Sequence, residues 1–126
     1  LGHTFGHALE AWAGYSSRLL HGEAVAIGMC QAARFSAERG LCPAGTAART
    51  EKHLRAVGLP TRVAHIAGAY RPDPKVLFAL MQQDKKVQSG RLTFILLRAI
   101  GDAFVTREVE AEDAAAFLER EVVLGA

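Results

Sequence analysis

Three of the five histidines of this chain lie close together near its start, at His3, His7 and His21. On a helix, residues four apart share one face, with β-carbons about 5–6 Å from each other. We therefore expect His3 and His7 to present their imidazoles to the same region. His21 follows a break at residues 14–17 and opens a second segment, so a tight return would bring it beside the pair. Because imidazole binds metals and carries protons near neutral pH, the pattern predicts a metal-dependent enzyme site.

Each of these histidines also has an ordinary interpretation. His3 and His7 are compatible with a helix surface, and His21 is compatible with a cap on the free N–H groups of a following helix. A catalytic zinc ion usually takes three protein ligands and keeps one position open, and this chain offers at most three clustered histidines, so the pattern is compatible with a site made by this chain alone but does not require one. Glu23 is a candidate metal ligand, a partner that orients His21, or an acid favoured in the first turn of a helix.

Two lysines and the remaining histidines are further candidates. Lys85 and Lys86 follow a predicted helix, where cations are favoured, and they are compatible with a solvated pair. They are equally compatible with a clamp for a phosphate or a carboxylate, since lysine is a suitable point charge. His53 and His65 are expected at the surface.

Composition indicates one ordinary globular domain, residues 1–126, with a hydrophobic core. Half of the residues are apolar, and 22% are charged, which excludes a disordered chain. A net charge of +2 without a dense basic block argues against nucleic acid as a partner. No apolar run approaches the length of a membrane span. The two cysteines, Cys30 and Cys42, are expected to be reduced thiols of a cytoplasmic protein.

Apolar periodicity, with glycines as terminators, predicts a mainly α fold with one small β-hairpin. The expected helices are 3–13, 22–39, 44–57, 74–83 and 110–123, the hairpin strands are 91–97 and 104–105, and 62–70 fits a short helix or irregular chain. Inward-facing positions are expected at Leu54 and Val57 of the third helix and at Val76, Leu77, Leu80 and Met81 of the fourth.

The 22–39 helix is apolar on most sides, so we expect it to lie centrally. Gly22 and Gly28 each weaken such a helix by about 1 kcal/mol, which is easier to explain if another backbone or a ligand comes close. The chain starts at Leu1, without Met and inside its richest motif. We expect it to be part of a longer polypeptide, because domain boundaries normally fall in polar linkers.

The first thirty residues carry a family signature. The run Leu1 to Glu10, the pair Gly14-Tyr15 and the run Leu20 to Met29 resemble the signature of the 3-dehydroquinate synthase family. The segment Asp84-Lys85-Lys86-Val87, the strand 92–97 and Ile100-Gly101 match the distal part of that family in order and spacing. The resemblance implies the helical C-terminal domain of such an enzyme, without its N-terminal NAD-binding domain.

The resemblance implies an activity and cofactors. Enzymes of this family use NAD and a divalent metal, Zn²⁺ or Co²⁺, to convert 3-deoxy-arabino-heptulosonate 7-phosphate, a sugar phosphate, into 3-dehydroquinate and phosphate in the shikimate pathway. The steps are transient oxidation, phosphate elimination, re-reduction, ring opening and aldol closure. The parent enzyme is expected to be a homodimer that binds NAD mostly through the missing domain.

The resemblance also implies a role for each site residue. His3 and His21 correspond to two metal ligands of the family, and the third ligand, a glutamate, is expected outside this chain. His7 falls on a residue that assists proton movement and binds substrate. One lysine contacts substrate, with Lys86 favoured over Lys85. Rival interpretations are another sugar phosphate cyclase, a metal-dependent polyol or glycerol dehydrogenase, and an inactive helical fragment.

Overall fold

The computed structural model describes residues 1–14, 19–66, 72–84 and 92–124. Its helices and strands are α1 (His3–Trp12), α2 (His21–Glu38), α3 (Ala44–Ala56), the 3₁₀ turn η1 (Val63–His65), α4 (Pro74–Asp84), β1 (Phe94–Ala99), β2 (Asp102–Thr106), α5 (Ala111–Glu119) and the π-helical turn η2 (Arg120–Leu124). The prediction of a mainly helical fold with one β-hairpin is confirmed. No helix among the described residues is both long enough and apolar enough to cross a membrane.

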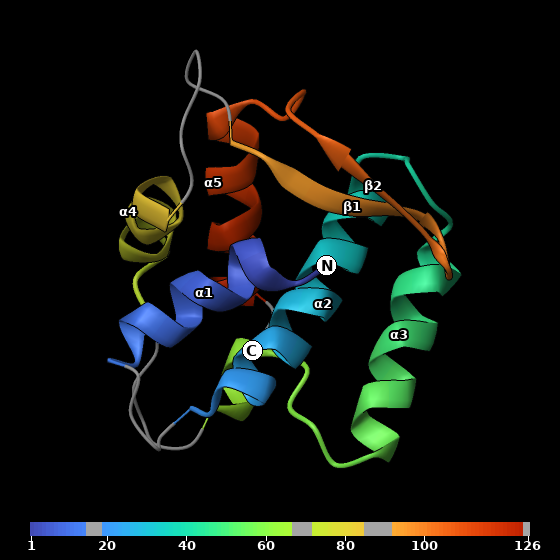
Figure 1. Cartoon of the computed structure of the whole chain (residues 1–126), viewed down its shortest axis with the longest axis horizontal. Helices are drawn as coiled ribbons and strands as arrows, with labels where there is room; N and C mark the ends of the chain where they lie inside the picture. The colour runs from blue at the N-terminus through green and yellow to red at the C-terminus, as the bar shows by residue number, and fades with distance from the viewer. Residues whose placement is uncertain (15–18, 67–71, 85–91, 125–126) are drawn as a thin grey trace.

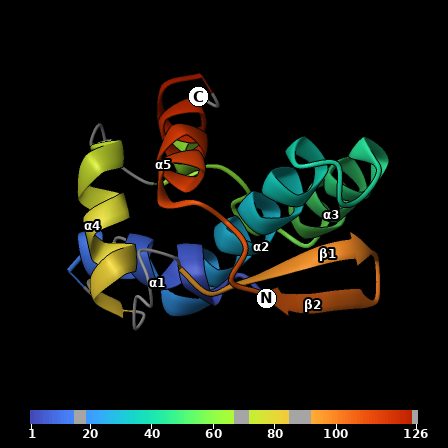
Figure 2. The ribbon, with the colours of Figure 1, turned by 90° about the horizontal axis from the view of Figure 1, so that it is seen from above.

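Helix α2 is the central element, as its composition predicted. It contacts α1, α3 and β1, while α4 packs against α1 and α5. Figure 1 shows α2 between α1 and α3, with the hairpin across one end of these helices. Figure 2 shows the two strands as a flat ribbon below α2 and α3, away from α5. The strands are antiparallel, with Phe94 opposite Thr106 and Leu97 opposite Ala103.

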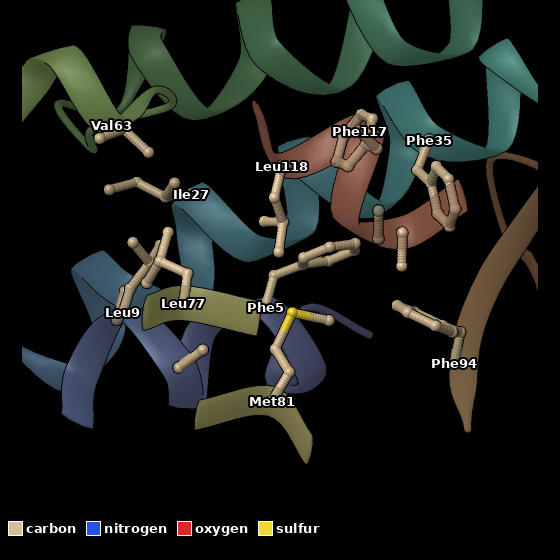
Figure 3. Packing of buried hydrophobic residues seen from close by; sticks show 14 of the residues in the cluster. Phe5, Leu9, Ile27, Phe35, Val63, Leu77, Met81, Phe94, Phe117 and Leu118 are labelled. Atoms are coloured by element: carbon tan, nitrogen blue, oxygen red, sulfur yellow. The ribbon is translucent and has the colours of Figure 1, made fainter. Parts of the chain in front are cut away.

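The core is built around four phenylalanine rings from four elements. Phe5 of α1 lies 5.5 Å from both Phe94 of β1 and Phe117 of α5, measured between ring centroids. Phe35 of α2 lies 4.7 Å from Phe117 and 5.6 Å from Phe94. All four rings are at most 2% exposed, and Met81 and Leu118 pack beside them (Figure 3). Aromatic burial on this scale joins α1, α2, α5 and the hairpin into one core.

Two predicted inward positions are wrong. Val57 is 60% exposed and Val76 is 45% exposed, whereas Leu54, Leu77 and Met81 are buried as expected. Val57 is the residue that ends α3 rather than part of its inner stripe. The last helix also differs from its prediction, because regular α-helix ends at Glu119 and the following turn is a π-helix. Both cysteines are buried free thiols, as predicted.

Helices α1 and α2 meet backbone to backbone. A Cβ atom on Gly28 would lie 2.1 Å from the carbonyl oxygen of Gly2 and 2.8 Å from the backbone nitrogen of Gly6. Gly2 itself has a φ of 86°, a conformation that L side chains rarely adopt. The prediction that another backbone approaches Gly28 is confirmed. Among the described residues, no atom beyond the neighbouring backbone lies within 4 Å of such a Cβ on Gly22, so they do not provide the same explanation there.

A network of partly buried charges braces the other half of α2. Arg34 donates to both carboxylate oxygens of Glu121, at 2.8 and 2.7 Å, and its side chain is 14% exposed. Glu51 of α3 accepts two hydrogen bonds from Arg62, at 2.9 and 3.1 Å, and lies 3.5 Å from Arg34. These ion pairs join α2 to α3 and to η2. Removing one partner of such a pair leaves the charge of the other poorly compensated.

We expect Gly28→Ala to lower the free energy of unfolding by about 3 kcal/mol, because the added methyl group forces α1 away from α2. Urea unfolding followed by circular dichroism measures the change. Gly45→Ala is the matched control, since Gly45 lies in α3 and, in the described part of the chain, no atom beyond its own helix backbone lies within 4 Å of an added Cβ. An equal effect of the two substitutions would contradict a backbone contact at Gly28.

We also expect a pH-dependent contribution from Glu51. Burial raises the pKa of this carboxyl, but hydrogen bonds from Arg62 and the charges of Arg62 and Arg34 outweigh burial, so the pKa is lower than its ordinary value of 4.5. A lowered pKa stabilises the folded state above pH 4.5, and this stabilisation disappears as the pH falls through the folded pKa. The stability difference between wild type and Glu51→Gln should therefore shrink below pH 4.5 in urea titrations. Glu119→Gln, at an exposed position of α5, serves as the control.

Candidate metal centre

Three imidazoles form a compact triangle where α1 meets the start of α2. The ring centroids of His3 and His7 lie 5.1 Å apart, and the ring of His21 lies 6.0 Å from His3 and 6.2 Å from His7. The expected proximity of the three histidines is therefore confirmed. His3 and His7 are one helical turn apart on α1, and His21 is the first residue of α2.

The glycine contact between the two helices sets the shape of this triangle. Because Gly28 lies against Gly2 and Gly6, the first turns of α1 lie directly on α2 with no side chain between the two backbones. The return between the helices includes residues 15–18, which lie outside the described residues, and Tyr15 of the family signature is among them. The chain is described again from Leu19, which is 2% exposed and anchors the segment before His21 in the core.

In His3 and in His21, the Nδ1 atom faces an oxygen acceptor. His3 Nδ1 lies 3.3 Å from the carbonyl oxygen of Leu1. His21 Nδ1 lies 3.1 Å from each carboxylate oxygen of Glu10. Carbonyl and carboxylate oxygens accept hydrogen bonds, so Nδ1 is the donor in both rings. In the neutral form of each ring, Nε2 is then the nitrogen with the lone pair that can bind a metal ion.

The site is open on one side. His3 is exposed, the side chain of His21 is 58% exposed, and His7 is half-buried. A pocket of about 150 Å³ adjoins His3 and is lined by Thr4 of α1, by Thr93 just before β1 and by Val105 of β2, among others. Thr4 Oγ1 donates to the carbonyl oxygen of Thr93 at 3.3 Å and ties α1 to the chain that leads into β1. The lining of this pocket includes His3 but neither His7 nor His21.

The donor set fits part of a zinc or cobalt site. Two imidazoles that are hydrogen-bonded through Nδ1 and leave Nε2 for coordination suit a borderline metal ion. Within the described ranges, however, no three His, Cys, Asp or Glu side chains converge closely enough to hold such an ion. A complete site therefore needs at least one ligand from elsewhere, because catalytic zinc usually has three protein ligands.

The two glutamates near His21 have different roles. Glu23 accepts a hydrogen bond from the backbone N–H of Leu20 at 2.9 Å, so it stabilises the first turn of α2 rather than orienting His21. Sequence reasoning missed Glu10 as the partner of His21. A signal for it exists, since His3, His7 and Glu10 are spaced i, i+4 and i+7 and so share one face of α1.

The remaining candidates do not join the triangle in the described part of the chain. Lys85 and Lys86 lie outside the described residues. The chain is described up to Asp84, at the end of α4, and again from Leu92, next to the Thr93 that lines the pocket. His53 on α3 and His65 in η1 are exposed, as predicted, and His65 Nδ1 accepts a hydrogen bond from the backbone N–H of Thr61 at 3.2 Å.

Comparison with known proteins places this site in a sequence family. Residues 1–87 match the family model described as 3-dehydroquinate synthase C-terminal. A 3-dehydroquinate synthase of Rhodopseudomonas palustris strain BisA53 is 58% identical over 125 residues, which cover 97% of this chain and 33% of that protein. One from Bradyrhizobium sp. strain BTAi1 is 54% identical and is covered to 32% of its length. The chain thus spans about a third of the length of the curated relatives it matches.

Solved structures with the same fold are sugar phosphate cyclases. A 2-deoxy-scyllo-inosose synthase complexed with carbaglucose-6-phosphate, NAD⁺ and Co²⁺ superposes with a TM-score of 0.76 at 25% identity, over 95% of this chain and 34% of that one. The 2-epi-5-epi-valiolone synthase of Streptomyces hygroscopicus, with NAD⁺ and Zn²⁺ bound, gives a TM-score of 0.72 at 29% identity, over 93% of this chain and 30% of that one.

We expect Glu23→Ala to lower the free energy of unfolding by about 1 kcal/mol, because the first turn of α2 loses a side-chain acceptor and a favourable charge. Glu23→Gln should cost less, since the amide oxygen can still accept from Leu20. Thermal and urea unfolding of both variants measure these differences. A Glu23→Ala variant as stable as the wild type would contradict the capping role.

Proposed function

The chain belongs to the 3-dehydroquinate synthase family, and from this premise we propose that it forms the metal- and substrate-binding half of such an enzyme. The proposed reaction converts 3-deoxy-arabino-heptulosonate 7-phosphate into 3-dehydroquinate and phosphate, in the shikimate pathway. The observation that carries the proposal is the triangle of imidazoles at the meeting point of α1 and α2, in which His3 and His21 are hydrogen-bonded through Nδ1.

In this proposal His3 and His21 hold a divalent metal ion. Support comes from the lone pairs on their Nε2 atoms and from the Co²⁺ and Zn²⁺ named for the two cyclases of the same fold. A metal ion bound there would polarise the hydroxyl and carbonyl oxygens of a sugar phosphate. A third ligand, a glutamate, would come from residues outside this chain, as would most of the NAD site.

His7 takes the proton-handling role in this proposal. Its ring lies 5.1 Å from His3, close enough to act on a substrate held by the metal ligands. It is also half-buried, which limits competition from water around the ring. Imidazole exchanges protons near neutral pH, so His7 can accept a proton from one substrate oxygen and return it to another.

Lys86, with Lys85 as the second choice, is proposed to bind an anionic group of the substrate. The support is positional, because the chain re-enters the described part at Leu92 and Thr93, and Thr93 lines the pocket beside His3. A lysine ammonium is a suitable point charge for phosphate or carboxylate. The assignment of the two lysines stays a prediction.

A different sugar phosphate cyclase is the second candidate, because two solved structures of the same fold are named as synthases of other products, 2-deoxy-scyllo-inosose and 2-epi-5-epi-valiolone. Identity favours the first candidate, since 58% to a 3-dehydroquinate synthase exceeds 25% and 29% to the two other cyclases. Action in the cytoplasm and assembly as a homodimer stay predictions.

The proposal is tested by separating metal binding from substrate binding in the protein that carries this chain at its full natural length. His21→Ala should weaken Zn²⁺ binding by more than about 100-fold and abolish turnover, because a ligand is lost. Lys86→Ala should keep the metal but raise KM by about 10-fold or more, because one charged contact to substrate is removed. Metal content, isothermal titration with Zn²⁺ and phosphate release measure these effects.

His53→Ala is the matched control for these variants, because it removes an exposed imidazole of α3 that the proposal gives no role. It should keep both metal affinity and turnover. Full turnover of the His21→Ala variant would contradict the ligand assignment, and wild-type KM in the Lys86→Ala variant would contradict the lysine assignment. Activity on another sugar phosphate in place of the heptulosonate would support the second candidate.

A further inference from the structure

We propose that Glu10 is a positioning residue, whose carboxylate orients His21 and holds its imidazole in the tautomer that binds a divalent metal ion. This inference rests on the proposed function, because it needs His21 to be a metal ligand. Its evidence is separate, however, since it comes from the contact between Glu10 and His21 and from the way α1 and α2 hold the two residues.

The contact between Glu10 and His21 is specific. Both carboxylate oxygens of Glu10 lie 3.1 Å from Nδ1 of His21, so the N–H of that nitrogen is shared between them. With Nδ1 protonated, the lone pair of the imidazole is on Nε2, which lies on the opposite side of the ring from the carboxylate. A negative charge behind a metal-binding imidazole also raises its basicity and improves it as a ligand.

The fold restrains Glu10 more than it restrains His21. The side chain of Glu10 is 14% exposed, whereas that of His21 is 58% exposed. Glu10 lies in the last turns of α1, beside Leu9, which is 1% exposed and part of the core. The more exposed imidazole is therefore held by a carboxylate with little freedom and little competing water, which strengthens their electrostatic interaction.

The two proposed metal ligands differ in the groups that orient them. His3 Nδ1 faces a neutral backbone carbonyl, that of Leu1, at 3.3 Å, and His21 Nδ1 faces an anionic carboxylate at 3.1 Å. Hydrogen bonds with an ionised partner are roughly twice as strong as neutral ones. The side chain of Glu10 can be replaced without changing the backbone, so the role of this orienting group can be tested by substitution.

The experiment compares Glu10→Gln and Glu10→Ala with wild type in the protein that carries this chain at its full natural length. Glutamine keeps the shape and a hydrogen-bond acceptor but removes the charge, whereas alanine removes both. We expect Zn²⁺ affinity to fall by about 10-fold in Glu10→Gln and by up to about 100-fold in Glu10→Ala. Isothermal titration with Zn²⁺ alone measures the affinities.

Glu38→Gln is the matched control. Glu38 lies at the far end of α2, where it accepts a hydrogen bond from Arg120 at 2.9 Å, so this substitution makes the same change of charge away from His21. Its Zn²⁺ affinity should equal that of wild type. A loss of affinity in Glu38→Gln as large as in Glu10→Gln would overturn the inference, since net charge alone would then explain the effect.

A spectroscopic readout separates positioning from a general effect on stability. The visible absorption bands of bound Co²⁺ report the arrangement of its ligands, and we expect them to change in Glu10→Gln while far-UV circular dichroism stays the same. If Glu10→Ala does not fold, Glu10→Gln decides the test by itself. Wild-type Zn²⁺ affinity together with an unchanged Co²⁺ spectrum in Glu10→Gln would overturn the inference.

The two levels of proposal fail in different ways. If the wild type binds neither Zn²⁺ nor Co²⁺, or if His21→Ala binds them as tightly as wild type, the proposed metal site itself is wrong. If the wild type binds metal and His21→Ala loses it, but both Glu10 variants bind like wild type, only the positioning role of Glu10 is wrong.

Discussion

The structure depends on one close contact between two helix backbones. A single added carbon on Gly28 would lie 2.1 Å from the carbonyl oxygen of Gly2, so α1 can occupy its place only while that position lacks a side chain. No side chain stands between the helices here, and none can adjust their separation. Backbone atoms therefore set the distance between α1 and α2 at this contact. A close-packed interior leaves little room for them to move.

The chemistry of the site follows from this contact. His3, His7 and Glu10 share one face of α1, but a helix face by itself brings no partner to them. Only the close approach of α2 brings His21 within 3.1 Å of Glu10 and places its ring about 6 Å from the other two imidazoles. The same contact thus brings together the candidate metal ligands and the group that orients one of them.

The remaining core holds this arrangement in place from the other side. Phe5 of α1 packs against rings from β1 and α5, and Ser36 of α2 accepts a hydrogen bond from the backbone N–H of Leu97 at 2.9 Å. Farther along α2, the pair Arg34–Glu121 joins that helix to the last turn of the chain. Helix α2 is therefore fixed along its length, with the histidine site at its first residue.

The sequence by itself determined the helices, the hairpin, the three histidines and the family, because apolar periodicity, glycine terminators and motif spacing are local properties of the chain. It did not determine that Val57 and Val76 are exposed, since periodicity near a helix end does not say where the neighbouring helix stops. Nor did it identify the partner of His21. Glu23 is nearer in sequence, but Glu10 is the carboxylate that contacts the ring, because the packing of α1 on α2 brings it there.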